Sequence, residues 1–259
     1  MRLIIITPIL ALDKSFPKTV VSVANNLSDN DLWLICLDSA SLLEEDDIED
    51  FLKDTLKSNQ YKVIKKSKQP YAGNARNSGL DYLEKEKFPF ILSFLDADDF
   101  IKHNYSQEIK KYFKNNKSGV VSFSYERHKK GKVYNVVHPL KKELYDDFKY
   151  FYNTAPLSTA VMINDKKVLS AARFGKRKRA NDQKYFLDIV KYFGYVHYQS
   201  VSIAIYNIKS GSLSNIKYKM PFYKLLALHD HGIKKTQSFL ILLYYAYRGF
   251  LRHFLGKEK

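Results

Sequence analysis

The stretch Phe90-Ile91-Leu92-Ser93-Phe94-Leu95-Asp96-Ala97-Asp98-Asp99 joins a short apolar run directly to three carboxylates. The run is too short for a helix and does not alternate, which indicates a strand buried on both faces. Three carboxylates at the end of a strand repel one another unless a cation lies among them, and hard oxygen ligands suit Mg²⁺ or Mn²⁺. A solvated acidic turn is the alternative for a bare Asp-x-Asp sequence. The position after a buried strand favours the metal site.

Similar apolar runs occur upstream and are separated by segments with apolar residues at helical spacing. The runs predict strands over residues 3–7, 32–37 and 62–64, in addition to 90–95. The intervening segments predict helices over residues 19–27, 42–56 and 74–85. This alternation implies an α/β fold with a parallel sheet and helices on its faces. Ligands of such open sheets collect at the carboxyl ends of the strands.

The second half of the chain has a different pattern. It predicts helices over residues 105–113 and 182–193 and strands over residues 119–125, 133–138 and 196–206. Because no repeat, low-complexity linker or hinge interrupts this pattern, we expect one catalytic domain over residues 1–215. Residues 216–259 are expected to form a helical tail rich in basic and aromatic residues.

Composition restricts the class of protein. The 259 residues contain 45% hydrophobic residues, enough for a sizeable core, which excludes a disordered tail. Cys36 is the single cysteine, so internal disulfides and cysteine-based zinc sites are excluded and a cytoplasmic location is expected. Pro8 and Asp13 interrupt the first apolar run, which argues against a signal peptide. The formal net charge of +16 favours polyanions, phosphorylated ligands or anionic lipid headgroups as partners.

Two further segments are expected beside the acidic strand end. Asp38 follows the second predicted strand, where it is either a turn or helix N-cap residue or a partner of Asp96 that faces a base or ribose hydroxyl. The segment 71–80, Tyr-Ala-Gly-Asn-Ala-Arg-Asn-Ser-Gly-Leu, opens a helix. Gly73 would let the backbone approach a ligand there, and Arg76 could donate to phosphate oxygens in a forked geometry. A helix cap with Arg76 as a surface charge is the alternative.

Together these segments resemble glycosyltransferase family 2 of the bacterial surface-polysaccharide type. The resemblance rests on Thr7-Pro8, Asp38-Ser39-Ala40-Ser41, Ala75-Arg76-Asn77-Ser78-Gly79 and Leu95-Asp96-Ala97-Asp98-Asp99, which occur in the family's order and spacing. It implies the GT-A fold, a Rossmann-like nucleotide-binding open sheet. It also implies an inverting transfer of a sugar from a nucleoside-diphosphate donor, commonly UDP-linked, to an acceptor hydroxyl. Ala40 departs from the family, which usually has glycine at that position.

The resemblance also assigns roles to residues of the donor site. Contacts with the nucleotide sugar are implied for Thr7, Pro8, Asp38, Gly73, Arg76, Asp96, Ala97 and Asp98. Asp96 and Asp98 would in addition hold the Mn²⁺ or Mg²⁺ ion.

Downstream, the resemblance is looser. Asp182 matches the last carboxylate of the family's general-base pair, although Asn181 replaces the preceding Glu. As a base it would remove the acceptor hydroxyl proton, and a helix N-cap is its alternative role. Lys209 stands where the family often has a histidine, so no histidine metal ligand is expected. Lys209 can still neutralise a phosphate as a point charge.

Two basic segments have more than one interpretation. The run 173–179, Arg-Phe-Gly-Lys-Arg-Lys-Arg, would face a phosphorylated acceptor, bind nucleic acid or be simply solvated. Because no recognised nucleic-acid module is present, no nucleic-acid partner is expected. Residues 239–255 carry apolar and aromatic residues near helical spacing with Arg248 and Arg252. This helix would lie in a membrane interface or pack on the catalytic domain.

The sequence therefore predicts a metal-dependent inverting glycosyltransferase that uses a UDP-sugar and a glycan or lipid-diphosphate-linked acceptor in cell-surface polysaccharide synthesis. It would be cytoplasmic and peripheral on the inner face of the membrane. A nucleotidyltransferase of related α/β fold and a non-enzymatic polyanion-binding protein remain alternatives; the first would release pyrophosphate and the second would bind polyanions in a salt-sensitive way.

Overall fold

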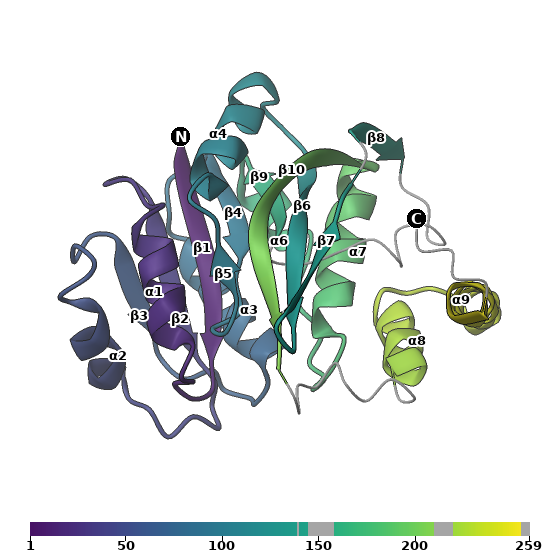
Figure 1. The fold of residues 1–259 in the computed structure, drawn as a ribbon, viewed down its shortest axis with the longest axis horizontal. Coiled ribbons are helices and arrows are strands. Elements are labelled where there is room, and N and C mark those ends of the chain that lie inside the picture. Colours follow the sequence, from purple (N-terminus) through teal and green to yellow (C-terminus); the bar gives the residue numbers. More distant parts are fainter. Residues whose placement is uncertain (139, 145–157, 210–219, 255–259) are drawn as a thin grey trace.

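The computed structural model describes residues 1–138, 140–144, 158–209 and 220–254. A ten-stranded sheet forms the centre, with the strand order β3-β2-β1-β4-β9-β6-β10-β5; β7 pairs with β6 and β8 with β10 (Figure 1). The strands are β1 Arg2–Ile9, β2 Leu32–Leu37, β3 Tyr61–Ile64, β4 Phe90–Phe94, β5 Phe100–Ile101, β6 Val120–Lys129, β7 Lys132–Val136, β8 Lys141–Leu144, β9 Thr159–Ile163 and β10 Tyr195–Ile208. The helices are α1 Phe16–Ala24, α2 Glu45–Leu52, α3 Ala72–Leu83, α4 Tyr105–Asn115, α6 Lys166–Ser170, α7 Asn181–Phe193, α8 Met220–Asp230 and α9 Lys235–Phe254.

The N-terminal half of the sheet is parallel, as predicted. β3, β2, β1 and β4 run parallel in that order, and every residue of β2 and β4 is buried. Burial on both faces explains why these strands are continuous apolar runs without alternation. Their carboxyl ends meet at one edge of the sheet, which brings the segments after β2 and β4 together.

The C-terminal half of the sheet is mixed and contains elements that the sequence pattern did not predict. β9 runs antiparallel to both β4 and β6, and β10 runs parallel to β6 and antiparallel to β5 and β8. β5, β8, β9 and α6 were not predicted. β9 is a fully buried run of Thr-Ala-Val-Met-Ile, a signal of the same kind as β4. β5 has only two residues and depends on its pairing with β10.

Helices cover both faces of the sheet and divide the core into two clusters. α1, α2 and α4 pack on one face, where Phe16, Ile48 and Phe113 are fully buried. α3, α6 and α7 pack on the other, where Leu80 and Phe186 are fully buried. Each such apolar side chain contributes about 1.5–3 kcal/mol of transfer free energy. The faces are therefore closed, and the sheet's edges and strand ends are left for ligands.

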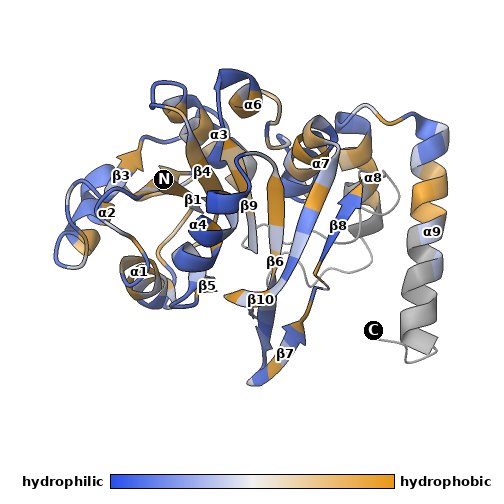
Figure 2. Cartoon of the chain, turned by 90° about the horizontal axis from the view of Figure 1, so that it is seen from above, coloured by the Kyte–Doolittle hydropathy of each residue, from blue (hydrophilic) through white to orange (hydrophobic). Residues whose placement is uncertain are grey.

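The last two helices extend the second cluster. Leu228 of α8 and Ile241 of α9 are fully buried in it, and Figure 2 shows α9 at the outer edge of the molecule beyond α8. The C-terminal helices therefore pack on the domain through part of their surface. The predicted boundary at residues 215 and 216 lies outside the described residues. Within the described part of the chain, no helix is long and apolar enough to cross a membrane.

Candidate active site

Asp38 lies directly after β2 and beside the end of β1. Its backbone N–H donates to the carbonyl of Ile9 at 2.8 Å, and its Oδ1 accepts the N–H of Ala40 at 2.9 Å. The residue is thus a turn residue, as one of the two sequence interpretations held. Because a carboxylate has about four acceptor positions on two oxygens, Asp38 can close this turn and still accept a hydrogen bond from a nucleotide.

Arg76, on α3, organises the site. Its side chain is only 5% exposed, and its Nη2 forms an ion pair with Asp96 after β4. Its Nη1 donates to Oδ1 of Asn181, the first residue of α7, at 3.1 Å. The guanidinium lies over the Phe174 ring, 5.1 Å from the centroid. The alternative of an exposed surface charge is therefore wrong, since one buried guanidinium connects β4, α3 and α7.

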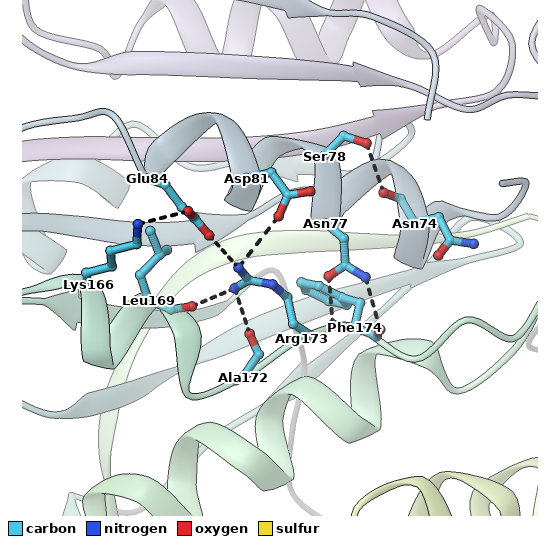
Figure 3. A network of polar contacts seen from close by, with 10 residues as sticks. All are labelled: Asn74, Asn77, Ser78, Asp81, Glu84, Lys166, Leu169, Ala172, Arg173 and Phe174. Carbon is cyan, nitrogen blue, oxygen red and sulfur yellow. Dashed lines mark hydrogen bonds and ion pairs between the residues drawn. The ribbon is translucent and has the colours of Figure 1, made fainter. Parts of the chain in front are cut away.

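A network along α3 holds Phe174 in this position (Figure 3). The Asn77 amide pairs with the Phe174 backbone in both directions, at 2.9 and 3.1 Å. Arg173 pairs with Glu84 at 3.2 Å and donates to the carbonyl of Leu169 at 2.7 Å. The segment after α6 is thereby fixed to α3, and the aromatic surface beneath Arg76 is fixed with it.

The basic run 173–179 is in part committed to such internal contacts. In addition to Arg173, Arg177 donates twice to the Asp230 carboxylate, at 2.8 and 3.0 Å. Arg179 lies 5.4 Å from the Tyr223 ring centroid. These arginines therefore join α3 and α8 to the run, which reduces the positive charge that it can offer to an acceptor.

Gly73 has a packing role in the structure. A Cβ at this position would lie 2.4 Å from the carbonyl oxygen of Gly175 and 2.9 Å from Cβ of Asn181. The missing side chain lets the start of α3 touch the start of α7, which is what places Arg76 against Asn181. These contacts give Gly73 a packing role, and its contact with a nucleotide stays a prediction.

Asp182 is the second residue of α7 and is partly buried. Burial raises the pKa of its carboxyl; the nearby Arg76 charge lowers the pKa and the Asp96 charge raises it. Sensitivity to both charges places Asp182 in the same electrostatic environment as the Arg76–Asp96 pair. A carboxylate with a raised pKa is a better proton acceptor, which suits a general base.

Thr19 and Asp99 hold the loop after β4; sequence reasoning assigned no role to Thr19 and counted Asp99 only among the three carboxylates of the expected metal site. The Thr19 hydroxyl is shared between the carbonyl oxygens of Ala97 and Asp99, at 2.9 and 3.0 Å. Asp99 is 1% exposed and accepts the N–H of Asn207 on β10 at 2.9 Å. Burial raises the pKa of Asp99 well above its usual value. The carbonyl of Ala97 is thus held by Thr19, and the buried Asp99 carboxylate attaches the loop to β10.

Lys209, after β10, reaches the other end of this loop. Its ammonium lies 2.6 Å from Oδ1 of Asp13 and 3.4 Å from Oδ2 of Asp98, and it donates to Oγ of Ser15 at 2.9 Å. Burial lowers the pKa of Lys209, but the hydrogen bond to Asp13 and the Asp98 charge outweigh it, so the pKa is raised. Lys209 is therefore a fixed positive charge beside Asp98. Asp13 and Ser15 were not predicted from the sequence.

The described carboxylates do not fit the predicted divalent-metal site. Asp96 is paired with Arg76, Asp98 faces Lys209, and Asp99 is buried in a contact with the backbone. No group of three or more His, Cys, Asp or Glu side chains suited to a metal ion occurs among the described residues. The three carboxylates that suggested a metal in the sequence thus separate into two paired groups and one buried anchor.

Thr7 is placed differently from the prediction. It is fully buried, and its hydroxyl accepts the indole N–H of Trp33 at 2.8 Å. Its side chain therefore faces the core and does not lie at the strand ends. Pro8 follows in β1, is partly exposed, and is in register with Cys36 of β2.

The open sheet, with Asp38 and Asp96 after the two parallel strands that flank β1 and a buried arginine paired with Asp96, defines a GT-A-type α/β protein. The family described as Glycosyl transferase family 2 matches residues 4–172, more than half of the chain. The chain belongs to this family and is a glycosyltransferase. Recognition from the four motifs is thereby confirmed.

Solved structures show the same fold. The first 349 residues of S. aureus TarS in complex with UDP-GlcNAc align with a TM-score of 0.66 at 17% identity, over 98% of this chain and 73% of that one. The same fragment in complex with UDP aligns with a TM-score of 0.63 at 16% identity, over 98% and 72%. None of the curated proteins compared with the chain matches it.

Proposed function

We propose that the protein transfers a sugar from a UDP-linked donor, with inversion, to a glycan or lipid-diphosphate-linked acceptor of cell-surface polysaccharide synthesis. The observation that carries the proposal is the grouping of Asp96, Arg76 and Asp182 beyond the carboxyl ends of the parallel strands, where Asp38 follows β2. TarS, which shares the fold, has been crystallised with UDP-GlcNAc and with UDP. That supports UDP as the nucleotide.

Each of these side chains has a chemical role in the proposed reaction. Asp38 and Asp96 accept hydrogen bonds from the base or ribose, and Arg76 holds Asp96 in position. Asp182 takes the proton of the acceptor hydroxyl as that oxygen attacks the anomeric carbon. The bond from the anomeric carbon to the diphosphate oxygen breaks on the opposite face, so one displacement inverts the configuration. UDP leaves with the bonding electron pair.

Titration of the full chain with UDP, UDP-sugars and other nucleoside diphosphates tests the donor site. We expect UDP to bind and Asp38→Asn to weaken it about tenfold, because a hydrogen bond to a charged group is lost. The variant keeps Oδ1 for the turn with Ala40, so its fold should be intact. The matched control is Asp50→Asn, a carboxylate on α2 that is 75% exposed.

Equal affinity of Asp38→Asn and the wild type for UDP would remove Asp38 from the site. The absence of any nucleotide binding would overturn the proposed function. Product analysis separates the classes of enzyme, since a transferase releases UDP from a UDP-sugar, and a nucleotidyltransferase releases pyrophosphate.

We further propose that α9 binds the anionic inner surface of the cell membrane, where a lipid-linked acceptor would lie. The exposed apolar side chains Phe239, Leu240, Leu243 and Tyr247 are each 51–58% exposed on a helix that also packs on the domain. The apolar stretch of α9 is visible at the molecular edge in Figure 2. The net charge of +16 would add attraction to anionic headgroups.

Sedimentation with anionic and zwitterionic vesicles tests this contact. The double variant Phe239→Ser, Leu243→Ser should bind anionic vesicles about tenfold more weakly, because apolar area is no longer inserted. Val133→Ser is the control, since Val133 is equally exposed, at 56%, but lies on β7. Equal binding by both variants and the wild type would contradict membrane contact through α9.

A further inference from the structure

The carboxylates of Asp96 and Asp98 each have a cationic side chain of the protein as a partner. Arg76 pairs with Asp96 from α3, and Lys209 faces Asp98 from the end of β10. A cation between such groups reduces their repulsion, because they stand next to each other in the loop after β4. In this protein two side chains supply positive charge at that position.

The Lys209 ammonium is held in place by ion pairs and a hydrogen bond. The ammonium lies 2.6 Å from Asp13, 2.9 Å from Ser15 Oγ and 3.4 Å from Asp98, so its partners come from two segments far apart in sequence. The side chains of Lys209, Asp13 and Asp98 are 30%, 46% and 38% exposed. The charge is therefore fixed in place and still accessible to a ligand at the strand ends.

A divalent cation would meet unfavourable conditions at this position. The described carboxylates offer it few oxygens, because Oδ1 of Asp96 is engaged by Arg76 and Asp99 is buried. It would also lie next to the Lys209 ammonium, and two like charges a few ångströms apart repel each other. An anionic diphosphate, by contrast, gains from the same ammonium, which has three N–H donors and no acceptor.

We propose that Lys209 supplies the positive charge at the donor diphosphate, so that the protein binds UDP and transfers sugar without a divalent metal. The inference rests on the proposed function and concerns the same site. As the bond between the anomeric carbon and the diphosphate oxygen breaks, the electron pair stays on that oxygen and the ammonium stabilises it. No proton needs to be transferred to the leaving group. Asp98 and Asp13 are positioning residues for Lys209.

Calorimetric titration of the full chain with UDP, in chelator and in Mg²⁺ or Mn²⁺, tests the proposal. We expect the UDP affinities in the two conditions to agree within about threefold. Lys209→Met should weaken UDP binding about tenfold or more in chelator, because a charge-assisted hydrogen bond is lost. Lys209→Arg should restore part of the affinity. Lys53→Met is the control, since Lys53 lies at the end of α2 and pairs with Asp50.

Asp98→Asn provides a second test that does not depend on the folding of a lysine variant. If Lys209 is the cation, the amide still offers an oxygen to its ammonium, and any change in UDP affinity that Asp98→Asn causes should be the same in chelator and in metal within about threefold. A metal site would lose a ligand instead, and metal-supported binding would fall by at least about tenfold. Thermal melts of each variant report whether the fold is retained.

The outcomes separate the two proposals. UDP binding by the wild type that appears only with metal, and that Asp98→Asn abolishes, overturns the role of Lys209 and leaves the donor site in place. An unchanged affinity in Lys209→Met also overturns that role. The absence of UDP binding in every condition overturns the proposed function together with this inference.

Discussion

Asp182→Asn is expected to lower the rate of sugar transfer by about 10²- to 10⁴-fold, the usual contribution of a general base. The amide has the size of the carboxylate but cannot accept the acceptor's proton. Because Asp182 is not expected to touch the nucleotide, UDP affinity should change by no more than about twofold. Transfer assays with a UDP-sugar and calorimetry with UDP measure the two effects separately.

The pH dependence gives an independent check on Asp182. Burial raises the pKa of its carboxyl, and the base must be ionised to act, so the wild-type rate rises as the pH increases through this raised pKa. Below the pKa the protonated carboxyl cannot take the acceptor proton. The ascending limb should be absent from the residual activity of Asp182→Asn.

The control for this prediction lies on the same helix. Asp188 is paired with Lys184 and with His231, at 2.6 Å in the latter case. Asp188→Asn should therefore affect stability and leave the ascending limb unchanged. Transfer by Asp182→Asn at the wild-type rate would remove Asp182 as the base.

Arg76→Ala is the second change with a large expected effect. It removes a buried guanidinium, leaving Asp96 without its counter-ion and Asn181 Oδ1 without its donor. Breaking a fully buried pair costs about 3–5 kcal/mol, but the Asp96 side chain is 43% exposed, so we expect a loss of about 2 kcal/mol in the free energy of unfolding. UDP affinity should fall about tenfold or more, because Asp96 is no longer held at the donor.

Urea denaturation and UDP titration measure these two losses. Arg76→Lys keeps the charge but cannot donate to Asp96 and Asn181 through a planar fork, so it should be intermediate in both assays. The control Arg177→Ala breaks a partly exposed pair with Asp230 and should cost no more than about 1 kcal/mol. A stability and UDP affinity of Arg76→Ala equal to those of the control would contradict the organising role of Arg76.

The first hundred residues show which strands and helices local sequence patterns can predict. The parallel strands β1 to β4 and the helices α1 to α3 were predicted within a few residues, because each is an apolar run or an apolar stripe of ordinary length. β9 was not predicted, although its five residues are fully buried, and its place between β4 and β6 depends on pairing across long stretches of chain. β5 has too few residues to form any pattern.

The sequence by itself determined the fold class, the strand ends that carry Asp38 and Asp96, and the helix that carries Arg76. These features follow from periodicity and from residue types that lie close together in the chain. Only the tertiary structure decided which side chains of the predicted site are buried or paired and which can contact a ligand. Asp99 is buried against β10, Thr7 turns to Trp33, and Lys209 approaches Asp98 from the far end of the chain. Such contacts join residues distant in sequence, so they can form only after the strands have paired, and no local pattern in the sequence indicates them.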